Sequence, residues 1–309
     1  RLLGKRRSWM LLAQTGIACG LVGMALTDPT QQITQLALFA LLVAFSSATQ
    51  DITIDAYRIE AVDAEYQGAM AATYVLGYRL ALLMAGAGAF YIADGASWAT
   101  AYIVMAALMG VGLMTTLLLA EPERSEEAAV ADLERQIEER LGVRGGLLRW
   151  FTDAVVSPFV EFFSRNGAAA LLILALIGVY KLSDITMGVM ANPFYLDLGF
   201  SKTEIADVTK IFGFFMTIAG AGLGGMLVLR FGLQRPLVLG AVLVAATNLL
   251  FAMLAVLEPS LMLLALVISA DNLSGGIATS VFIAYLSSLT NQAYTATQYA
   301  LFSSLMTLP

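Results

Sequence analysis

The sequence lacks histidine altogether and contains one cysteine among its 309 residues. Such a chain cannot build a Ser-His-Asp or Cys-His catalytic system, a histidine-ligated metal site or an internal disulfide. Charged residues are also scarce, at 13% of the chain, where soluble domains carry about 25%. The formal net charge of −6 argues against a nucleic-acid partner. We therefore expect a protein that has no metal or cofactor and is not an enzyme.

Apolar residues are abundant instead: 59% of the chain is hydrophobic, and the mean hydropathy is +0.79. A chain with so little polar surface cannot face water on all sides, so the composition predicts a membrane protein. A helix needs about 20 consecutive apolar residues to cross the hydrocarbon core. Eight segments meet this need, and a ninth begins near Tyr294. The eight are residues 9–26, 33–54, 68–93, 98–120, 168–195, 205–229, 236–257 and 261–289.

The basic residues of the connecting segments fall almost entirely on one side of this layout, and only Lys202 lies on the other side. Because an excess of Lys and Arg marks the cytoplasmic face, the first span is expected to enter from the cytoplasm. The predicted organisation is an N-terminal bundle over residues 1–120, a cytoplasmic linker over 121–166 and a C-terminal bundle over 167–309.

The linker begins with an amphipathic helical pattern, which the Gly145-Gly146 pair ends. The aromatic-rich stretch 147–163 that follows is typical of a helix at the membrane interface. The linker is either a regulatory domain or a tether between the two bundles, and the absence of a further motif favours the tether. The apolar positions of the first pattern are Val130, Leu133, Ile137 and Leu141.

The spans contain a loose internal repeat. Those that begin near residues 9, 33 and 68 correspond to those that begin near 236, 261 and 294, and both sets share similar turns. Arg7 precedes Arg235 by 228 residues, and Pro29 precedes Pro259 by 230. Two halves in the same orientation are typical of major-facilitator transporters. We therefore expect an all-α, two-bundle fold with a parallel repeat, and on this register further spans are expected before and after the chain.

Basic residues gather just before the first repeated span of each half. They are either a charge lock between helices at a cytoplasmic gate or a positive-inside anchor, and the sequence leaves both open. These residues are Lys5, Arg6 and Arg7 in the first half, and Arg230 and Arg235 in the second.

Charged residues inside the spans are the informative positions, since each costs about 2.5–3.5 kcal/mol at a helix centre. Asp51, Asp55 and Arg58 are spaced i, i+4 and i+7, so they share one helix face. Arg79 lies within the next span, within predicted reach of Asp51. This group is either a buried ion pair at the cytoplasmic gate or a protonatable coupling site.

In the C-terminal half, Lys181 and Asp184 are spaced i, i+3 inside the fifth span and are expected to face a central cavity. They form either an ion pair or a proton-coupling site in which Asp184 is the candidate acid. Asp271 and Asn272 begin a polar, glycine-bearing interruption of the eighth span, which either lines the cavity or allows close helix packing. Tyrosines within the spans, such as Tyr180, either stack on sugar rings or pack between helices.

The same residues carry a resemblance to the AmpG-type muropeptide permeases of the major facilitator superfamily. The matching strings include Gln50-Asp51-Ile52, Tyr78-Arg79, Tyr180-Lys181-Leu182, Asn272-Leu273 and Ala296-Thr297-Gln298. The resemblance implies a transporter in the bacterial inner membrane. Such a transporter imports N-acetylglucosaminyl-1,6-anhydro-N-acetylmuramyl sugars and peptides by proton symport for cell-wall recycling. The candidate substrate-cavity residues are Gln50, Tyr78, Tyr180, Asp271, Asn272 and Gln298.

The expected partners are a glycopeptide substrate, protons and membrane lipid, and the expected state is a monomer. A carrier of another bulky anionic solute is an alternative, as is a receptor or scaffold that does not transport. A scaffold has no need of charges such as Lys181 and Asp184 inside the membrane, so these residues favour a transporter.

Overall fold

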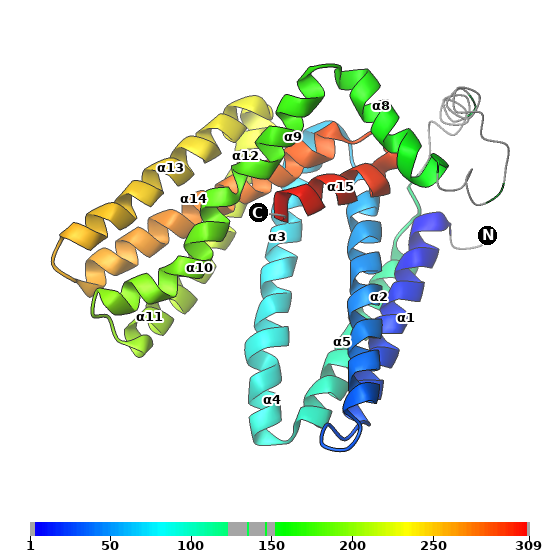
Figure 1. The fold of residues 1–309 in the computed structure, drawn as a ribbon, viewed down its shortest axis with the longest axis horizontal. Coiled ribbons are helices and arrows are strands. Elements are labelled where there is room, and N and C mark those ends of the chain that lie inside the picture. Colours follow the sequence, from blue (N-terminus) through cyan, green and yellow to red (C-terminus); the bar gives the residue numbers. More distant parts are fainter. Residues whose placement is uncertain (1–3, 123–134, 136–145, 147–151, 308–309) are drawn as a thin grey trace. The chain divides into compact units, whose positions relative to one another are not determined.

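The computed structural model describes residues 4–122, 135, 146 and 152–307, and these residues form helices without strands (Figure 1). Eight helical segments are long and apolar enough to cross a membrane, as the sequence predicts. The chain is thus an all-α, multi-pass membrane protein. The segments are Lys5–Ala25, Ile33–Glu60, Ala64–Gly95, Trp98–Leu118, Ala169–Asp197, Phe214–Phe231, Gln234–Val256 and Leu261–Leu289.

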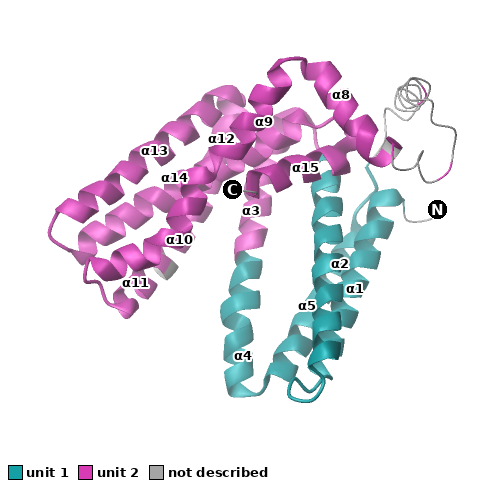
Figure 2. Ribbon diagram, in the orientation of Figure 1, with its two compact units in different colours: residues 1–61, 80–125 teal, residues 62–79, 126–309 magenta. Residues whose placement is uncertain are grey.

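The chain divides into two compact units (Figure 2). The first contains residues 1–61 and 80–125, and the second contains residues 62–79 and 126–309. The boundary falls inside helix α3 (Gln67–Leu83), whose first residues belong to the second unit. The division into two bundles and a linker that the sequence suggests stays a prediction.

In the first unit, helix α1 (Lys5–Ala25) packs against α2 (Ile33–Glu60) and α5 (Trp98–Leu118). A polar contact lies within this apolar packing, because Gln14 Nε2 donates to Thr116 Oγ1 at 3.1 Å and both side chains are buried. Each group satisfies the other, which avoids an unpaired polar atom in the membrane. The unit also contains the π-helical turn η2 (Met84–Gly88) and α4 (Ala89–Gly95).

In the second unit, α14 (Leu261–Leu289) packs against α12 (Phe214–Phe231) and α13 (Gln234–Val256). Glycines allow the close approach of α12 to α14: a Cβ on Gly220 would overlap the carbonyl of Leu273, and one on Gly224 would overlap that of Ile277. Small residues at helix contacts are the usual means of packing within membranes.

Two of the spans predicted from hydropathy are interrupted. The fifth consists of α9 (Ala169–Tyr180) and α10 (Leu182–Asp197), which meet at Lys181. The sixth was expected from residue 205, but α12 begins at Phe214, after the short helix α11 (Lys202–Val208) and the π-helical turn η4 (Thr209–Gly213).

Helix α11 begins at a capping box. The Ser201 hydroxyl accepts the Glu204 N–H, and the Glu204 carboxylate accepts the Ser201 N–H at 2.8 Å and its hydroxyl at 2.7 Å. These bonds hold the pKa of Glu204 below its usual value. The capping box therefore fixes where α11 begins.

Three short helices complete the second unit: η3 (Thr152–Val156), α8 (Ser157–Asn166) and α15 (Thr295–Thr307), the last of which follows the turn η5 (Gln292–Tyr294). Helix α8 lies within the predicted interfacial part of the linker and is amphipathic, with Phe162 buried and Phe163 partly exposed. The first amphipathic pattern, with Val130, Leu133, Ile137 and Leu141, lies outside the described residues.

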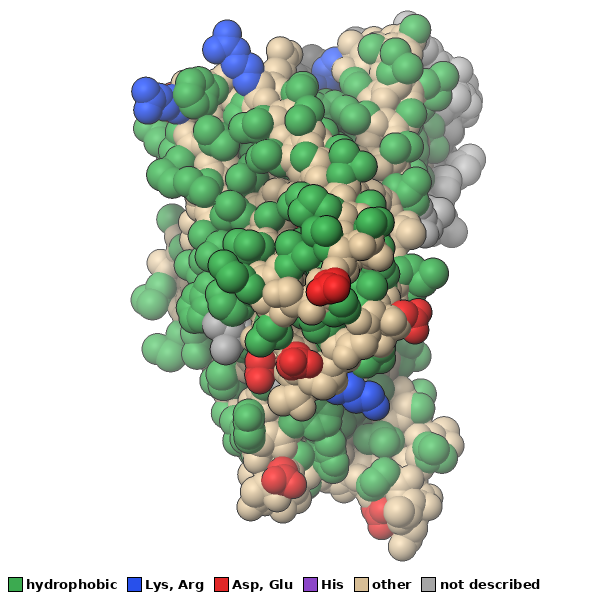
Figure 3. All heavy atoms as spheres, turned by 90° about the vertical axis from the view of Figure 1, so that its left-hand side faces the viewer, with side chains coloured by type: hydrophobic (Ala, Val, Ile, Leu, Met, Phe, Trp, Pro, Cys, Tyr) green, Lys and Arg blue, Asp and Glu red, His purple; other side chains and the backbone are tan. Residues whose placement is uncertain are grey.

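Large hydrophobic side chains cover much of the exposed surface, as Figure 3 shows for one face. On α13, Val238 is 64% exposed, Leu249 71% and Val256 86%. A surface so apolar is unsuited to water and suited to lipid tails.

Candidate functional site

Lys181 lies at the centre of the polar contacts between the fifth and eighth spans. Its ammonium Nζ donates to Asp184 Oδ2 at 2.7 Å and to Thr279 Oγ1 at 2.6 Å. The Lys181 side chain is 14% exposed and that of Asp184 is 29% exposed. The predicted pairing of Lys181 with Asp184 is therefore present. Thr279 could not be predicted from the sequence, because a lone threonine in an apolar span gives no signal.

Asp271, on α14, lies close enough to interact electrostatically with Asp184 and Lys181. The Thr247 hydroxyl of α13 points toward its Oδ1 from 3.4 Å. We call Lys181, Asp184 and Asp271 the charge cluster. It joins an ion pair predicted in one span to a substrate-cavity residue predicted in another.

Asn272, the neighbour of Asp271, makes structural contacts. Its Oδ1 accepts the Thr217 hydroxyl of α12 at 3.1 Å, and its Nδ2 donates to the Ile268 carbonyl at 2.9 Å. Asp271 therefore joins the charge cluster and Asn272 ties α14 to α12, and the lining of a cavity by this polar interruption stays a prediction.

The two candidate tyrosines lie in different settings. Tyr180 stacks face to face on Phe282, with ring centroids 4.2 Å apart, and its hydroxyl donates to the Leu237 carbonyl at 3.3 Å. Its ring thus packs α9 against α14, next to the charge cluster. Tyr78 is 56% exposed. Arg79 beside it has no hydrogen bond or ion pair with any residue that the structure describes.

In the first unit, Asp51 and Asp55 lie on one face of α2 and differ in their surroundings. Arg58 Nη2 lies 3.3 Å from Asp55 Oδ1, and Arg58 is 4% exposed. Asp51, one turn earlier, is exposed. Gln50 Oε1 is buried and finds no hydrogen-bond donor among the described residues. An unpaired buried oxygen of this kind is suited to a polar ligand.

The basic segment before the first span forms a second charged group in the first unit. Arg6 makes a two-pronged contact with Glu60: Nη2 lies 2.5 Å from Oε1, and Nε lies 3.0 Å from Oε2. The Glu121 carboxylate accepts the backbone N–H groups of Arg6 at 2.7 Å and Arg7 at 3.1 Å. The Arg7 guanidinium donates to the carbonyls of Thr116 at 3.0 Å and Leu117 at 2.7 Å.

Glu121 thus acts as a helix cap from 115 residues away. The N-cap of α1 is Gly4, which has no side chain to accept its free N–H groups. A carboxylate placed at a helix N-terminus also interacts favourably with the helix dipole. Glu60 and Glu121 could not be predicted as partners of Arg6, because they lie 54 and 115 residues from it along the chain. The remaining predicted basic residues, Lys5, Arg230 and Arg235, are exposed.

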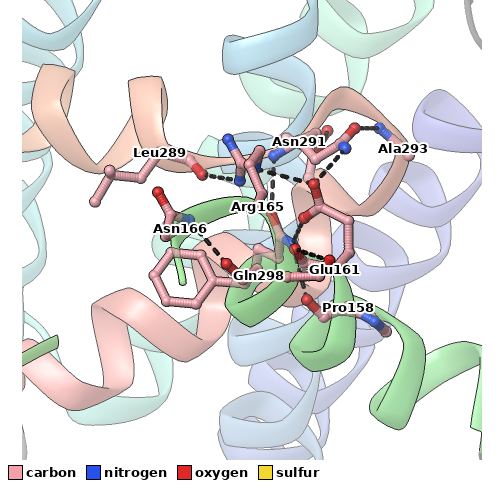
Figure 4. Close-up of polar contacts among 11 residues, drawn as sticks. Pro158, Glu161, Arg165, Asn166, Leu289, Asn291, Ala293 and Gln298 are labelled. Atoms are coloured by element: carbon pink, nitrogen blue, oxygen red, sulfur yellow. Dashed lines mark hydrogen bonds and ion pairs between the residues drawn. The ribbon is translucent and has the colours of Figure 1, made fainter. Parts of the chain in front are cut away.

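Gln298 belongs to a different polar cluster from Lys181 (Figure 4). Its Nε2 donates to Glu161 Oε2 at 2.6 Å and to the Pro158 carbonyl at 2.9 Å, and its Oε1 accepts the Asn291 N–H at 2.7 Å. Glu161 also accepts Asn291 Nδ2 at 2.9 Å and lies 2.9 Å from Arg165 Nε. Gln298 is 1% exposed. The cluster ties α8 to α15 and to the end of α14.

The chemistry available to these groups is charge pairing and proton exchange. Among the described residues, no group of three His, Cys, Asp or Glu side chains could hold a metal ion. The charge cluster combines exchangeable carboxyl groups with a cation inside an apolar span, an arrangement that marks ion and substrate pathways in membrane proteins.

Comparisons with known proteins identify the family of the chain. The family model described as Major Facilitator Superfamily matches residues 1–309. The putative transporter AmpG 4 of Rickettsia conorii is 32% identical over 307 residues, which are 99% of this chain and 70% of that protein. The anhydromuropeptide permease of Escherichia coli K12 is 36% identical over 304 residues, which are 98% of this chain and 58% of that protein.

Among solved structures, the proton:xylose symporter XylE bound to 6-bromo-6-deoxy-D-glucose matches with a TM-score of 0.65 at 15% identity. The match covers 98% of this chain and 70% of that chain. At this identity the likeness is one of fold alone.

Proposed function

This chain belongs to the Major Facilitator Superfamily, and we propose that it imports anhydro-muropeptides by proton symport for cell-wall recycling. The substrates are N-acetylglucosaminyl-1,6-anhydro-N-acetylmuramyl sugars and their peptides. The observation that carries the proposal is the 36% identity to the E. coli anhydromuropeptide permease over 98% of the chain. The chain spans 58% of that relative's length, so the activity is proposed for the protein that these residues form.

The geometry supports transport over a purely structural role. Lys181 and Asp184 pair with each other inside a span, although each would be costly there alone. A scaffold would be as stable with apolar residues at these positions, since ion pairs in low dielectric gain little over good packing. A transporter needs such groups, because its substrate and its proton must be bound partway across the membrane.

The remaining roles form part of the same proposal. The protein lies as a monomer in the bacterial inner membrane, surrounded by lipid, with the linker on the cytoplasmic side. Residues 1–120 and 167–309 form the two transmembrane bundles. Gln50 lines the substrate path, where its unpaired buried oxygen supports a polar ligand. The pair of Arg6 and Glu60 supports a lock at the cytoplasmic gate.

Uptake into right-side-out membrane vesicles tests the proposal. Labelled N-acetylglucosaminyl-1,6-anhydro-N-acetylmuramic acid should accumulate when the outside is made acidic, and a protonophore should abolish the accumulation. Vesicles without the protein provide the control. Uptake that ignores the proton gradient would contradict symport, and the absence of uptake with any muropeptide would contradict the proposed substrate class.

A further inference from the structure

The charge cluster carries more acid than base. Lys181 contributes one positive charge, whereas Asp184 and Asp271 contribute two negative charges when both are ionised. The cluster then has a surplus of one negative charge within the apolar spans. Binding one proton removes this surplus, and two nearby carboxylates that share one cation favour that outcome.

The two carboxylates do not share the cation equally. Asp184 accepts a charge-assisted hydrogen bond from Lys181 Nζ at 2.7 Å. Asp271 has no such bond from any cation that the structure describes, and its nearest donor is the Thr247 hydroxyl at 3.4 Å. That separation exceeds the usual range of an O–H···O bond. Protonation of Asp271 therefore disrupts fewer contacts than protonation of Asp184 would.

The surroundings of Asp271 contain no other described charge that would hold it ionised. Helix α10 and its N-cap place Asp184, Lys181 and the Tyr195 hydroxyl around it, and α13 contributes the uncharged Thr247. The described side chains of α12 add only the Thr217 hydroxyl, which binds Asn272. Asp184 repels a second negative charge at Asp271, and the attraction of Lys181 is already directed to Asp184.

The candidate acids of the first unit are less suited to this role. Asp55 has a cation, Arg58, at 3.3 Å, a contact of the kind that Asp271 lacks among the described residues, and Asp51 is exposed. The proton affinity of an exposed carboxyl changes little when its surroundings change from wet to dry, whereas that of a partly buried carboxyl changes much.

We infer that Asp271 is the carboxyl that binds the transported proton, an assignment that rests on the proposed symport. The proton joins a carboxylate oxygen of Asp271 from the outer side, which leaves Lys181 and Asp184 as a neutral pair. In this neutral form the cluster can be enclosed without a net charge. The same proton leaves the carboxyl on the cytoplasmic side, and no electron or other group is transferred.

The test compares four variants with the wild type in proteoliposomes, using labelled N-acetylglucosaminyl-1,6-anhydro-N-acetylmuramic acid. At zero membrane potential, a difference of one pH unit across the membrane can drive about tenfold accumulation of a substrate that is carried with one proton, provided that the transport step moves no net charge. Asp271→Asn should lose this accumulation completely but retain exchange of labelled for unlabelled substrate. Asp271→Glu, which keeps a carboxyl, should retain both. Asp207→Asn, an exposed position on α11, is the matched control and should behave as the wild type.

Asp184→Asn separates the two acids of the cluster. With Asp184 neutral, Lys181 and the ionised Asp271 already form a neutral pair, so Asp271 should bind the proton only from a more acidic outside and accumulation should be weaker than in the wild type. Gradient-driven accumulation by Asp271→Asn would overturn the assignment.

An infrared measurement decides the assignment without transport. All 23 Asp and Glu residues contribute to the carbonyl stretching band of protonated carboxyls, so the titration of Asp271→Asn should lack one component that the purified wild type shows, even if exchange by that variant is also lost. An unchanged band in Asp271→Asn would overturn the assignment. If the wild type transports no muropeptide but the band behaves as expected, the proposed substrate fails and the proton site stands.

Discussion

At the scale of single residues, the free-energy cost of burying a charge depends on its partner, and Arg6 is the clearest case. The side chains of Arg6 and Glu60 are 10% and 11% exposed and form a two-pronged contact. Removal of one member of such a pair leaves the other uncompensated, at about 3–5 kcal/mol. We expect Arg6→Ala to lower the thermal midpoint of the purified protein, whereas the exposed Arg235→Ala should leave it nearly unchanged. Equal midpoints for the two variants would mean that the pair contributes no stability.

The Arg79 side chain gives a second prediction at this scale. It has no hydrogen bond or ion pair with the described part of the chain, although it lies inside a span. The sequence places Asp51 as its partner; the two residues belong to different units, so the pairing stays a prediction. Arg79→Ala should reduce the yield of folded protein, because a carboxylate within the membrane is costly when its cation is removed. Combining it with Asp51→Asn should restore part of that yield, and the absence of rescue would show that the two residues do not meet.

The sequence could predict those residues of the site whose partners lie a few positions away in the same helix. Lys181 and Asp184 are three residues apart in an apolar span, so their cost and their spacing both indicate a pair. The partners Thr279, Glu60 and Glu121 could not be found, because they lie about 50 to 120 residues from the groups they contact. Helical spacing relates only near neighbours, and contacts between spans depend on the packing of whole helices.

At the scale of helices, the packing of α12 on α14 depends on positions that hold no side chain. A Cβ at Gly220 would overlap the Leu273 carbonyl, whereas one at Gly222 would meet nothing within 4 Å. Overpacking of a close contact costs about 1–3 kcal/mol. We therefore expect Gly220→Ala to lower the thermal midpoint, and Gly222→Ala, the matched control two residues away, to leave it unchanged or raise it slightly. Similar midpoints would show that α12 and α14 can separate at little cost.

Hydropathy predicted all eight spans but not the interruptions within them. The break between α9 and α10 falls at Lys181, where the apolar run continues on both sides. The start of α12 at Phe214 likewise falls within an apolar stretch. Hydropathy averages over a whole span, whereas the first boundary falls at the single residue Lys181 and the second at the π-helical turn η4.

At the scale of the whole molecule, the distribution of basic residues predicts the orientation in the membrane. Helix α13 has Gln234 at one end, beside Arg235, and Glu258 just beyond the other end, and both residues are exposed. Because Lys and Arg are retained on the cytoplasmic side, position 234 should face the cytoplasm and position 258 the outside. A single cysteine introduced at either position, in a Cys19→Ala background, reports its side through a maleimide that does not cross membranes.

In intact bacterial cells with a permeable outer membrane, Glu258→Cys should be labelled and Gln234→Cys should not. In inside-out vesicles the two results should exchange, because the cytoplasmic face is then accessible. The Cys19→Ala parent should remain unlabelled in both preparations. The reverse pattern would place the basic segments outside and contradict the predicted orientation.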